Sequence, residues 1–287
     1  CGGIGSAFYE LAIALRESGH DVSVLLVNQF LEQDNETFLG IKIYKIDINK
    51  ISRLNLIREI GEQLKLINPD VIHFHDWLGM ASGIKNIFKK AETKILIGLH
   101  GPTAWTRTGN PWPKDIHGNL NISENHLYEE GLIRALEKDS LLNSDLIISP
   151  SEYMNKWVKE NIGIEKDIIN QRNCNLSNRF KVYEKVILEN KNKLIFFGRL
   201  EERKGIKIFL EALEKINTKP EHIIFVGTDC YIEENQLATE IIKDKLQMLD
   251  IKYEFQSDLN RFEALELIKN LNYIVVIPSI IENSPCV

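Results

Sequence analysis

The sequence predicts an α/β fold built on doubly wound parallel sheets. Segments with helical periodicity and segments with strand periodicity alternate along the chain, which is typical of parallel strands joined by covering helices. The strand segments are short and continuously apolar, as expected for strands buried on both faces. The alternation stops in a polar stretch and then starts again, and 287 residues are enough for two domains with separate cores.

The first series of elements begins with an amphipathic helix that ends at Gly19. Its apolar residues recur at helical spacing and are Phe8, Leu11, Ala12 and Leu15. A second helix is predicted between residues 54 and 67. Apolar strands are predicted at 22–27, 41–46, 71–74, 95–99 and 146–149.

The second series follows a polar stretch at 170–192, which is rich in Asn, Lys, Arg and Glu. We place the domain boundary there and expect domains at 1–185 and 186–287. In the second domain an amphipathic helix carries Ile206, Phe209, Leu210 and Leu213, and strands are predicted at 194–197, 223–226 and 274–277. The loop at 101–121 is long for a simple connection, and loops of that length are usually functional or disordered.

Composition excludes several classes of function. The net charge of −6 gives no overall attraction for nucleic acid, and no apolar run approaches the about 18 residues of a membrane span. The four cysteines are far apart, without metal-ligand spacing, so a reducing, cytoplasmic compartment is expected. Because Cys1 stands inside a glycine-rich stretch with no strand before it, we also expect a piece to be missing at the amino-terminal end.

The opening glycine-rich stretch is a candidate anion site. Gly2 to Ser6 leads directly into a helix, so backbone amides near Gly3 and Gly5 could face a phosphate of a bound donor. The dinucleotide-binding fingerprint fails, however, because Phe8 stands where its third glycine should be. A plain tight turn is an equal alternative.

A basic segment follows the first strand of the second domain. Arg199 and Lys204 lie between this strand and the next helix, at the strand edge where doubly wound sheets bind ligands. Two such cations can hold a diphosphate as its negative charge grows. Gly227, which follows the next strand, is counted with them as a donor-binding residue. A solvated basic turn is the alternative interpretation.

The last residues place a carboxylate after another apolar strand. Glu282 is suited to accept hydrogen bonds from sugar or ribose hydroxyls, while Asn283 and Ser284 follow it with amides that could face phosphate. Pro285 could begin a helix there. An isolated loop glutamate is otherwise more often a surface residue.

Taken in order, the motifs GGIGS, HFHDW, GLHG, SPSEY, FGRLEERKG and PSIIENSP resemble retaining glycosyltransferases of family 4. The resemblance implies the GT-B fold, with two Rossmann-like domains that face each other across a cleft. It implies that Arg199 and Lys204 bind the donor diphosphate and that Glu282 is the first glutamate of a paired motif. The second member would fall beyond Val287, so a piece is expected to be missing at the carboxyl-terminal end as well. The family's Pro-Asn-Gly turn before the interdomain linker is absent here.

The same resemblance implies an acceptor side in the first domain. His100, after the strand at 95–99, matches the family's histidine that approaches the transferred sugar. His75, Asp76 and Trp77 are expected near the acceptor, and Trp105 could stack on a sugar ring. On residue pattern alone, His100 is more often structural, and a tryptophan is more often a core residue.

A metal or cofactor is not expected. His73 and His75 lie two apart on a strand and share a face, but no third ligand of matching pattern appears. The chain has no Asp-x-Asp motif to hold a metal-bound nucleotide sugar. We therefore expect metal-independent transfer, in which Arg199, Lys204 and helix amides stabilise the leaving diphosphate.

The sequence favours an enzyme that transfers a hexose-type sugar from a nucleotide diphosphate sugar to a hydroxyl of a carbohydrate or lipid-linked acceptor. No nucleic-acid partner is expected, and peripheral membrane contact and oligomeric state stay open. The alternatives are an epimerase or hydrolase of nucleotide sugars and an inactive nucleotide-sugar-binding subunit. An NAD-dependent oxidoreductase is a further rival, against which the failed fingerprint counts.

Overall fold

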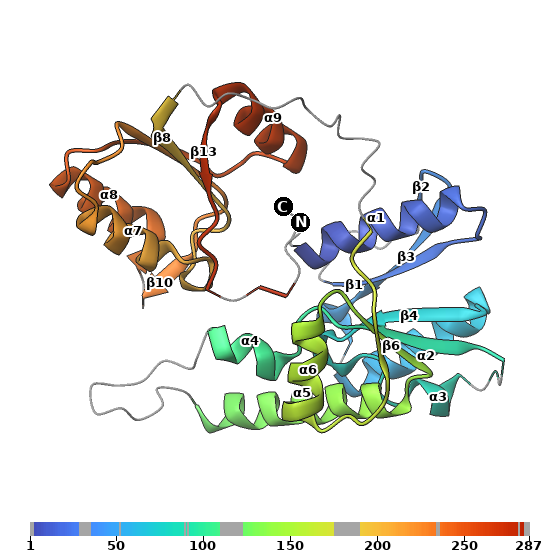
Figure 1. The fold of residues 1–287 in the computed structure, drawn as a ribbon. Helices are drawn as coiled ribbons and strands as arrows, with labels where there is room; N and C mark the ends of the chain where they lie inside the picture. The colour runs from blue at the N-terminus through green and yellow to red at the C-terminus, as the bar shows by residue number, and fades with distance from the viewer. Residues whose placement is uncertain are drawn as a thin grey trace. The chain divides into compact units, whose positions relative to one another are not determined.

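The computed structural model describes residues 3–28, 36–51, 53–88, 90, 92–109, 123–174, 190–233, 236–280 and 282–283 (Figure 1). The chain divides into two compact units. The first comprises Cys1–Phe180 with Asn283–Val287, and the second comprises Lys181–Glu282. The predicted boundary between residues 185 and 186 lies outside the described residues.

The first unit begins with helix α1 (Gly3–Glu17), which packs on a three-stranded sheet through Ala12 and Ile13. The strands are β1 (Ser23–Asn28), β2 (Glu36–Phe38) and β3 (Ile41–Asp47), in the order β1-β3-β2. β1 is parallel to β3, and β2 is antiparallel to it. The 3₁₀ turn η1 (Ile48–Lys50) and helix α2 (Arg53–Ile67) then lead to the second sheet.

The second sheet of this unit is entirely parallel, in the order β4-β5-β6-β7. Ile97 and Ile147 form part of its buried middle. The strands are β4 (Val71–His75), β5 (Lys94–Gly98), β6 (Leu146–Ser149) and β7 (Ile168–Asn170). The connecting elements are η2 (Trp77–Gly79), α3 (Ile84–Ile87), α4 (Thr103–Gly109), α5 (Glu124–Asn143) and α6 (Glu152–Ile162).

The second unit contains a four-stranded parallel sheet in the order β12-β9-β8-β13. Its strands are β8 (Asn190–Phe197), β9 (His222–Val226), β12 (Lys252–Gln256) and β13 (Tyr273–Val276). Its helical elements are η4 (Glu202–Lys204), α7 (Ile206–Lys215), α8 (Ala238–Met248) and α9 (Arg261–Leu271). A small antiparallel pair, β10 (Tyr231–Glu233) and β11 (Gln236–Leu237), precedes α8.

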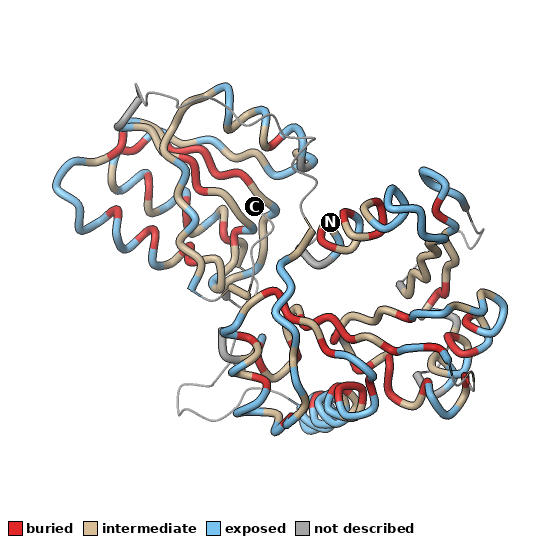
Figure 2. The backbone as a smooth tube through the Cα atoms, turned by 45° about the vertical axis from the view of Figure 1, so that its right-hand side comes forward, coloured by how far each residue is buried: buried red, intermediate tan, exposed pale blue. Residues whose placement is uncertain are grey.

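The four-stranded sheet of the second unit is covered on both faces. Phe196 and Phe225 point into a cluster with residues of α7 and α8, whereas Ile195 and Ile224 point to the opposite face, toward α9. The alternation follows from the two-residue period of a strand, and Figure 2 marks the middle of the sheet as buried. The predicted α/β, doubly wound fold class is confirmed here, as are the predicted strands and the predicted helix of this unit.

Two local predictions in the first unit are wrong. Gly3 to Ser6 form the first turn of α1 rather than a loop. A glycine costs only about 1 kcal/mol in a helix, so packing of the apolar face that follows decides the conformation. The predicted loop at 101–121 contains helix α4 over Thr103–Gly109, and residues 110–122 lie outside the described part of the chain.

Gly205 is required by a close backbone approach in the second unit. It has a φ of +82°, and a Cβ there would lie 2.0 Å from the carbonyl oxygen of Pro278. We predict that Gly205→Ala lowers the free energy of unfolding of this unit by about 2 kcal/mol or more, because strain and a backbone clash add. All tryptophans of the chain lie before residue 181, so circular dichroism should detect a transition that tryptophan fluorescence does not follow.

Gly131 provides the matched control. It lies inside α5, and a Cβ there would meet nothing within 4 Å. Gly131→Ala should therefore stabilise the first unit by roughly 0.5–1 kcal/mol. If Gly205→Ala unfolds like the unchanged chain, the close approach at Gly205 is not a constraint on the fold.

Candidate functional site

A pocket lies at the carboxyl edge of the parallel sheet of the first unit. The ends of all four strands contribute to it, as expected where parallel strands finish at the same edge. Helix α1 adds two apolar residues to its wall. The lining includes Ala7 and Leu11 from α1, His75 from β4, His100 after β5, Ser149 from β6 and Gln171 after β7.

Three histidines form one cluster in this pocket. His73 and His75 point to the same face of β4, with ring centroids 5.6 Å apart, and the ring of His75 lies 4.4 Å from that of His100. Phe8 of α1 packs on His75, with the two ring centroids 4.1 Å apart. Nε2 of His73 and both ring nitrogens of His75 are buried and have no hydrogen-bond partner among the described residues.

Burial keeps these imidazoles neutral. It lowers the pKa of His73 and of His100 to about 4, and it lowers the pKa of His75 to about 2 with help from the repulsion of the other two rings. A neutral imidazole carries one hydrogen-bond donor and one acceptor. The cluster therefore suits hydroxyl groups, which both donate and accept.

Asp76 holds the backbone that carries His100. Its side chain is only 3% exposed, and its Oδ2 accepts hydrogen bonds from the backbone N–H groups of His100 and Gly101, each at 2.9 Å. Burial raises its pKa to about 7, although those two hydrogen bonds oppose the rise. The sequence predicted an acceptor contact for Asp76, but the structure gives it a positioning role beneath the pocket.

Gly98 keeps room for the histidine cluster. A Cβ at this last residue of β5 would lie 2.7 Å from Nε2 of His73 and 3.4 Å from Nε2 of His100. Any larger residue would therefore displace the rings. Gly98 is not among the residues predicted from the sequence, although its place in the GLHG motif, two residues before His100, is a usable signal.

The two predicted tryptophans have different outcomes. Trp105 is 3% exposed, and its ring packs against Gly101, so the structure places it among the core residues, and its stacking on a sugar stays a prediction. Trp77 begins η2, but its side chain lies outside what the structure describes.

Asn283 lies in the first unit, where its amide donates to the carbonyl oxygens of Leu99 and His100 at 3.2 and 3.3 Å. Its Oδ1 accepts a hydrogen bond from Ser151. The side chain of Asn283, a residue predicted to bind the donor, thus holds the strand end beside His100. Ser284 lies outside the described residues.

The second unit presents a cluster of cations at the carboxyl end of β8. Arg199 and Arg203 each bind Oε1 of Glu201, at 3.0 and 2.9 Å, and Lys204 forms an ion pair with Glu282. Arg203 also approaches Glu282 at 3.8 Å. Among the described residues, three cations thus pair with two carboxylates, and Arg199 is half-exposed. The structure brings Arg199, Lys204 and Glu282 together, as the sequence predicted, and adds Glu201 and Arg203.

Backbone contacts between neighbouring strand ends hold this cluster in place. The N–H of Ile280, after β13, donates to the carbonyl oxygen of Arg203 at 3.0 Å. A Cβ at Gly227 would lie 2.0 Å from the carbonyl oxygen of Gly198, so this glycine lets the segment after β9 approach the one after β8. Gly227 therefore has a structural role, and its part in donor binding stays a prediction.

Gly3 and Gly5, also predicted to bind the donor, lie in the first turn of α1 in the first unit. In the part of the chain that the structure describes, no group of three or more His, Cys, Asp or Glu side chains could hold a metal ion. Nor does any described helix have the length and apolarity needed to cross a bilayer.

The neutral state of the histidine cluster can be measured directly. We predict that the ring-proton signals of His73, His75 and His100 stay constant from pH 8 to about pH 5 in nuclear magnetic resonance spectra, whereas an unperturbed imidazole titrates near 6.5. Because each pKa is lower in the folded chain, the unfolded chain takes up these protons first, and their binding opposes folding as the pH falls from about 6.5 toward 4. A midpoint near 6.5 for any of the three would contradict the buried, neutral cluster.

Comparison with known proteins identifies the kind of molecule. The model of Glycosyltransferase Family 4 matches residues 1–170. A search of curated protein sequences gives no match. Sucrose-phosphate synthase from Thermosynechococcus elongatus is structurally similar, with a TM-score of 0.69 and 15% identity over 100% of this chain and 72% of that one.

Two further solved structures are similar. A glycosyltransferase from Rickettsia africae has a TM-score of 0.57 and 17% identity, over 97% of this chain and 70% of that one. HepE from Anabaena, solved with UDP and glucose, has a TM-score of 0.57 and 16% identity, over 92% of this chain and 68% of that one. These likenesses show that the fold is GT-B, as the sequence predicted.

Proposed function

Because this chain belongs to glycosyltransferase family 4, we propose that it transfers a hexose-type sugar from a nucleoside diphosphate sugar to a hydroxyl acceptor, with retention at the anomeric carbon. The cation cluster of the second unit carries the proposal. Arg199, Arg203 and Lys204 gather at the carboxyl end of β8, where a parallel sheet binds ligands, and guanidinium and ammonium groups suit a diphosphate. A similar structure, HepE, holds UDP.

In this proposal the protein's own cations stabilise the leaving diphosphate, without a metal ion. Charge that develops on the β-phosphate as the glycosidic bond breaks is met by fixed positive groups, which need little reorganisation. Glu282, paired with Lys204, orients that ammonium and accepts hydrogen bonds from donor hydroxyls. Arg203 bridges the two carboxylates and keeps the cluster together.

The acceptor is proposed to bind in the pocket of the first unit. His75 and His100 offer neutral nitrogens that can donate to or accept from a sugar hydroxyl. The apolar wall from Ala7 and Leu11 suits the carbon face of a sugar ring or the start of a lipid-linked chain. We propose a carbohydrate or lipid-linked acceptor and a cytoplasmic enzyme.

Incubation with donor sugars and an acceptor panel tests the reaction itself. Nucleoside diphosphate should be released slowly with donor alone and much faster once a suitable hydroxyl acceptor is added. The panel should contain free sugars, lipid-linked sugars and DNA, and the product should keep the anomeric configuration of the donor. Equal release with and without every acceptor would favour a hydrolase, and release of an altered sugar would favour an epimerase.

The diphosphate assignment predicts the effect of two substitutions. Arg199→Ala and Lys204→Ala should each reduce transfer about 10²-fold or more while circular dichroism stays unchanged, because each removes a charge that meets the leaving group. Lys207→Ala, in α7 of the same unit, is the matched control and should keep near-normal turnover. Normal turnover in both cluster variants would contradict the assignment.

The role of His100 predicts a different kinetic pattern. His100→Ala should lower kcat about tenfold or more and change the affinity for nucleoside diphosphate little, because the imidazole is proposed to act on the reacting sugar. His20→Ala removes an exposed histidine outside the pocket and serves as the control. An equal loss in kcat and in nucleotide affinity would mark His100 as a structural residue.

A further inference from the structure

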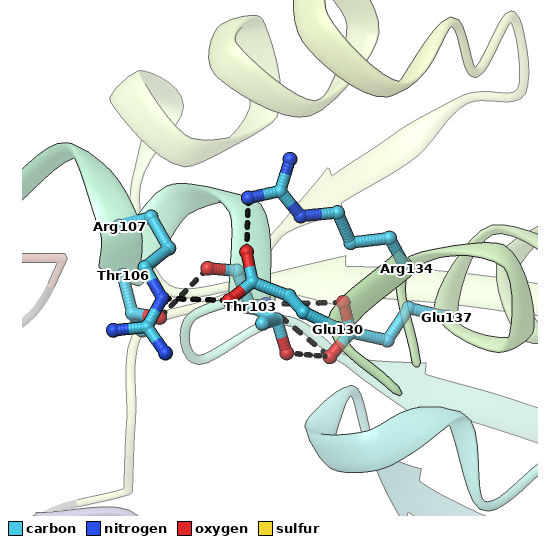
Figure 3. Close-up of polar contacts among 6 residues, drawn as sticks. All are labelled: Thr103, Thr106, Arg107, Glu130, Arg134 and Glu137. Atoms are coloured by element: carbon cyan, nitrogen blue, oxygen red, sulfur yellow. Dashed lines mark hydrogen bonds and ion pairs between the residues drawn. The ribbon is translucent and has the colours of Figure 1, made fainter. Parts of the chain in front are cut away.

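Glu137 of α5 holds two loop segments at the edge of the pocket's sheet. It is 3% exposed, and its two carboxylate oxygens lie 3.2 and 3.0 Å from the backbone nitrogen of Thr103, which donates to them. The hydroxyl of Thr103 donates to Oε1 at 2.7 Å (Figure 3). The backbone N–H of Leu78 also faces this carboxylate and favours its charged form, which opposes the rise that burial causes in the pKa of Glu137. One side chain thus ties the turn after β4 to the start of α4 after β5.

Together with Asp76, this carboxylate accounts for every backbone N–H from His100 to Thr103. Asp76 takes the N–H groups of His100 and Gly101, Glu137 takes that of Thr103, and Pro102 has none. The segment that carries His100 is therefore held at each available donor by a buried carboxylate.

The cost of this arrangement indicates a specific role. Burial raises the pKa of Glu137, so the carboxylate is held away from water at a cost in free energy. Repulsion from Glu137 is also one cause of the raised pKa of Asp76. The turn that supplies the second donor is itself strained, with Leu78 at a φ of +58° and Gly79 packed so closely that a Cβ would lie 2.4 Å from the backbone of Leu136.

A second buried glutamate on the same helix provides a contrast. Glu130 lies seven residues earlier and is also buried, at 6% exposed. Its Oε2 accepts from Nε of Arg107 at 2.7 Å, and its Oε1 pairs with Arg134 (Figure 3). It bonds side chains, whereas Glu137 bonds backbone amides of the segments beside His100.

From this contrast we propose that Glu137 is a positioning residue for the transfer reaction. It acts through the His100–Thr103 segment, whose placement sets the position of the His100 imidazole at the pocket. The proposal rests on the proposed function of His100, and it assigns to Glu137 no contact with either substrate. Among the described residues, Glu130 bonds Arg107 and Arg134 and no residue of the His100–Thr103 segment.

The test compares Glu137→Gln with Glu130→Gln in the complete chain. Gln is nearly the same size, but its NH₂ cannot accept the amides that a carboxylate takes. We expect Glu137→Gln to lower kcat about tenfold or more, to leave nucleoside diphosphate affinity within about twofold, and to speed hydrogen exchange at Leu78 and Thr103. Glu130→Gln should keep kcat within about twofold. If Glu137→Gln unfolds, Glu137→Asp, which keeps the charge but shortens the reach, takes its place.

A double substitution separates positioning from general stability. If Glu137 acts through His100, then His100→Ala with Glu137→Gln should be no slower than His100→Ala alone, because the effects of residues that act as a unit do not add. Additive losses, or normal kcat in Glu137→Gln, would overturn the positioning role while leaving the function of His100 intact. Full activity in His100→Ala alone would instead overturn the proposed function on which this role depends.

Discussion

Parallel strand pairing is the constraint on which both candidate sites depend. When strands run in one direction, their carboxyl ends meet at one edge, so residues far apart in sequence are brought together there. In the first unit this edge gathers His75, His100 and Ser149. In the second unit β8 and β13 are paired neighbours, which is why the segment with Arg203 and the segment with Ile280 can share a hydrogen bond.

The polar side chains at the two sheet edges find their partners in different ways. In the first unit the carboxylates point inward to backbone amides, and the imidazoles that line the pocket stay neutral because they are buried. In the second unit the charged groups are partly exposed and pair with one another. Among the described residues of this cluster, the cations outnumber the carboxylates. The first arrangement suits a hydroxyl-bearing acceptor and the second suits a diphosphate, which is the division of labour that the proposed reaction needs.

The sequence predicted the elements whose signal is local. Continuous apolar runs located the strands, and the helical spacing of Ile206, Phe209, Leu210 and Leu213 located α7, because burial on both faces of a sheet leaves such patterns. The cation cluster was predicted because its members follow apolar strands. The sequence could not show that Glu201 and Arg203 complete it, since loop charges are usually solvated.

The other residues of the site are determined by tertiary contacts, which a local sequence pattern does not predict. Glu130 and Glu137 are buried, yet a glutamate in a polar helix is ordinarily a surface residue, so neither was selected. Asp76 and Trp105 were selected as acceptor contacts, but both are buried. Motif spacing could show that these residues stand near the site, but only the fold distinguishes those that face the pocket from those that support it.

Binding of nucleotides tests the central claim most directly, because that claim is that the cation cluster recognises a diphosphate. Calorimetric titrations of the unchanged chain should compare UDP, GDP and ADP, each with its monophosphate. For the preferred base, the diphosphate should bind at least about tenfold more tightly at low salt, and the difference should shrink as salt screens the exposed part of the cluster. Equal affinity for diphosphate and monophosphate would contradict the assignment of Arg199, Arg203 and Lys204 to the donor.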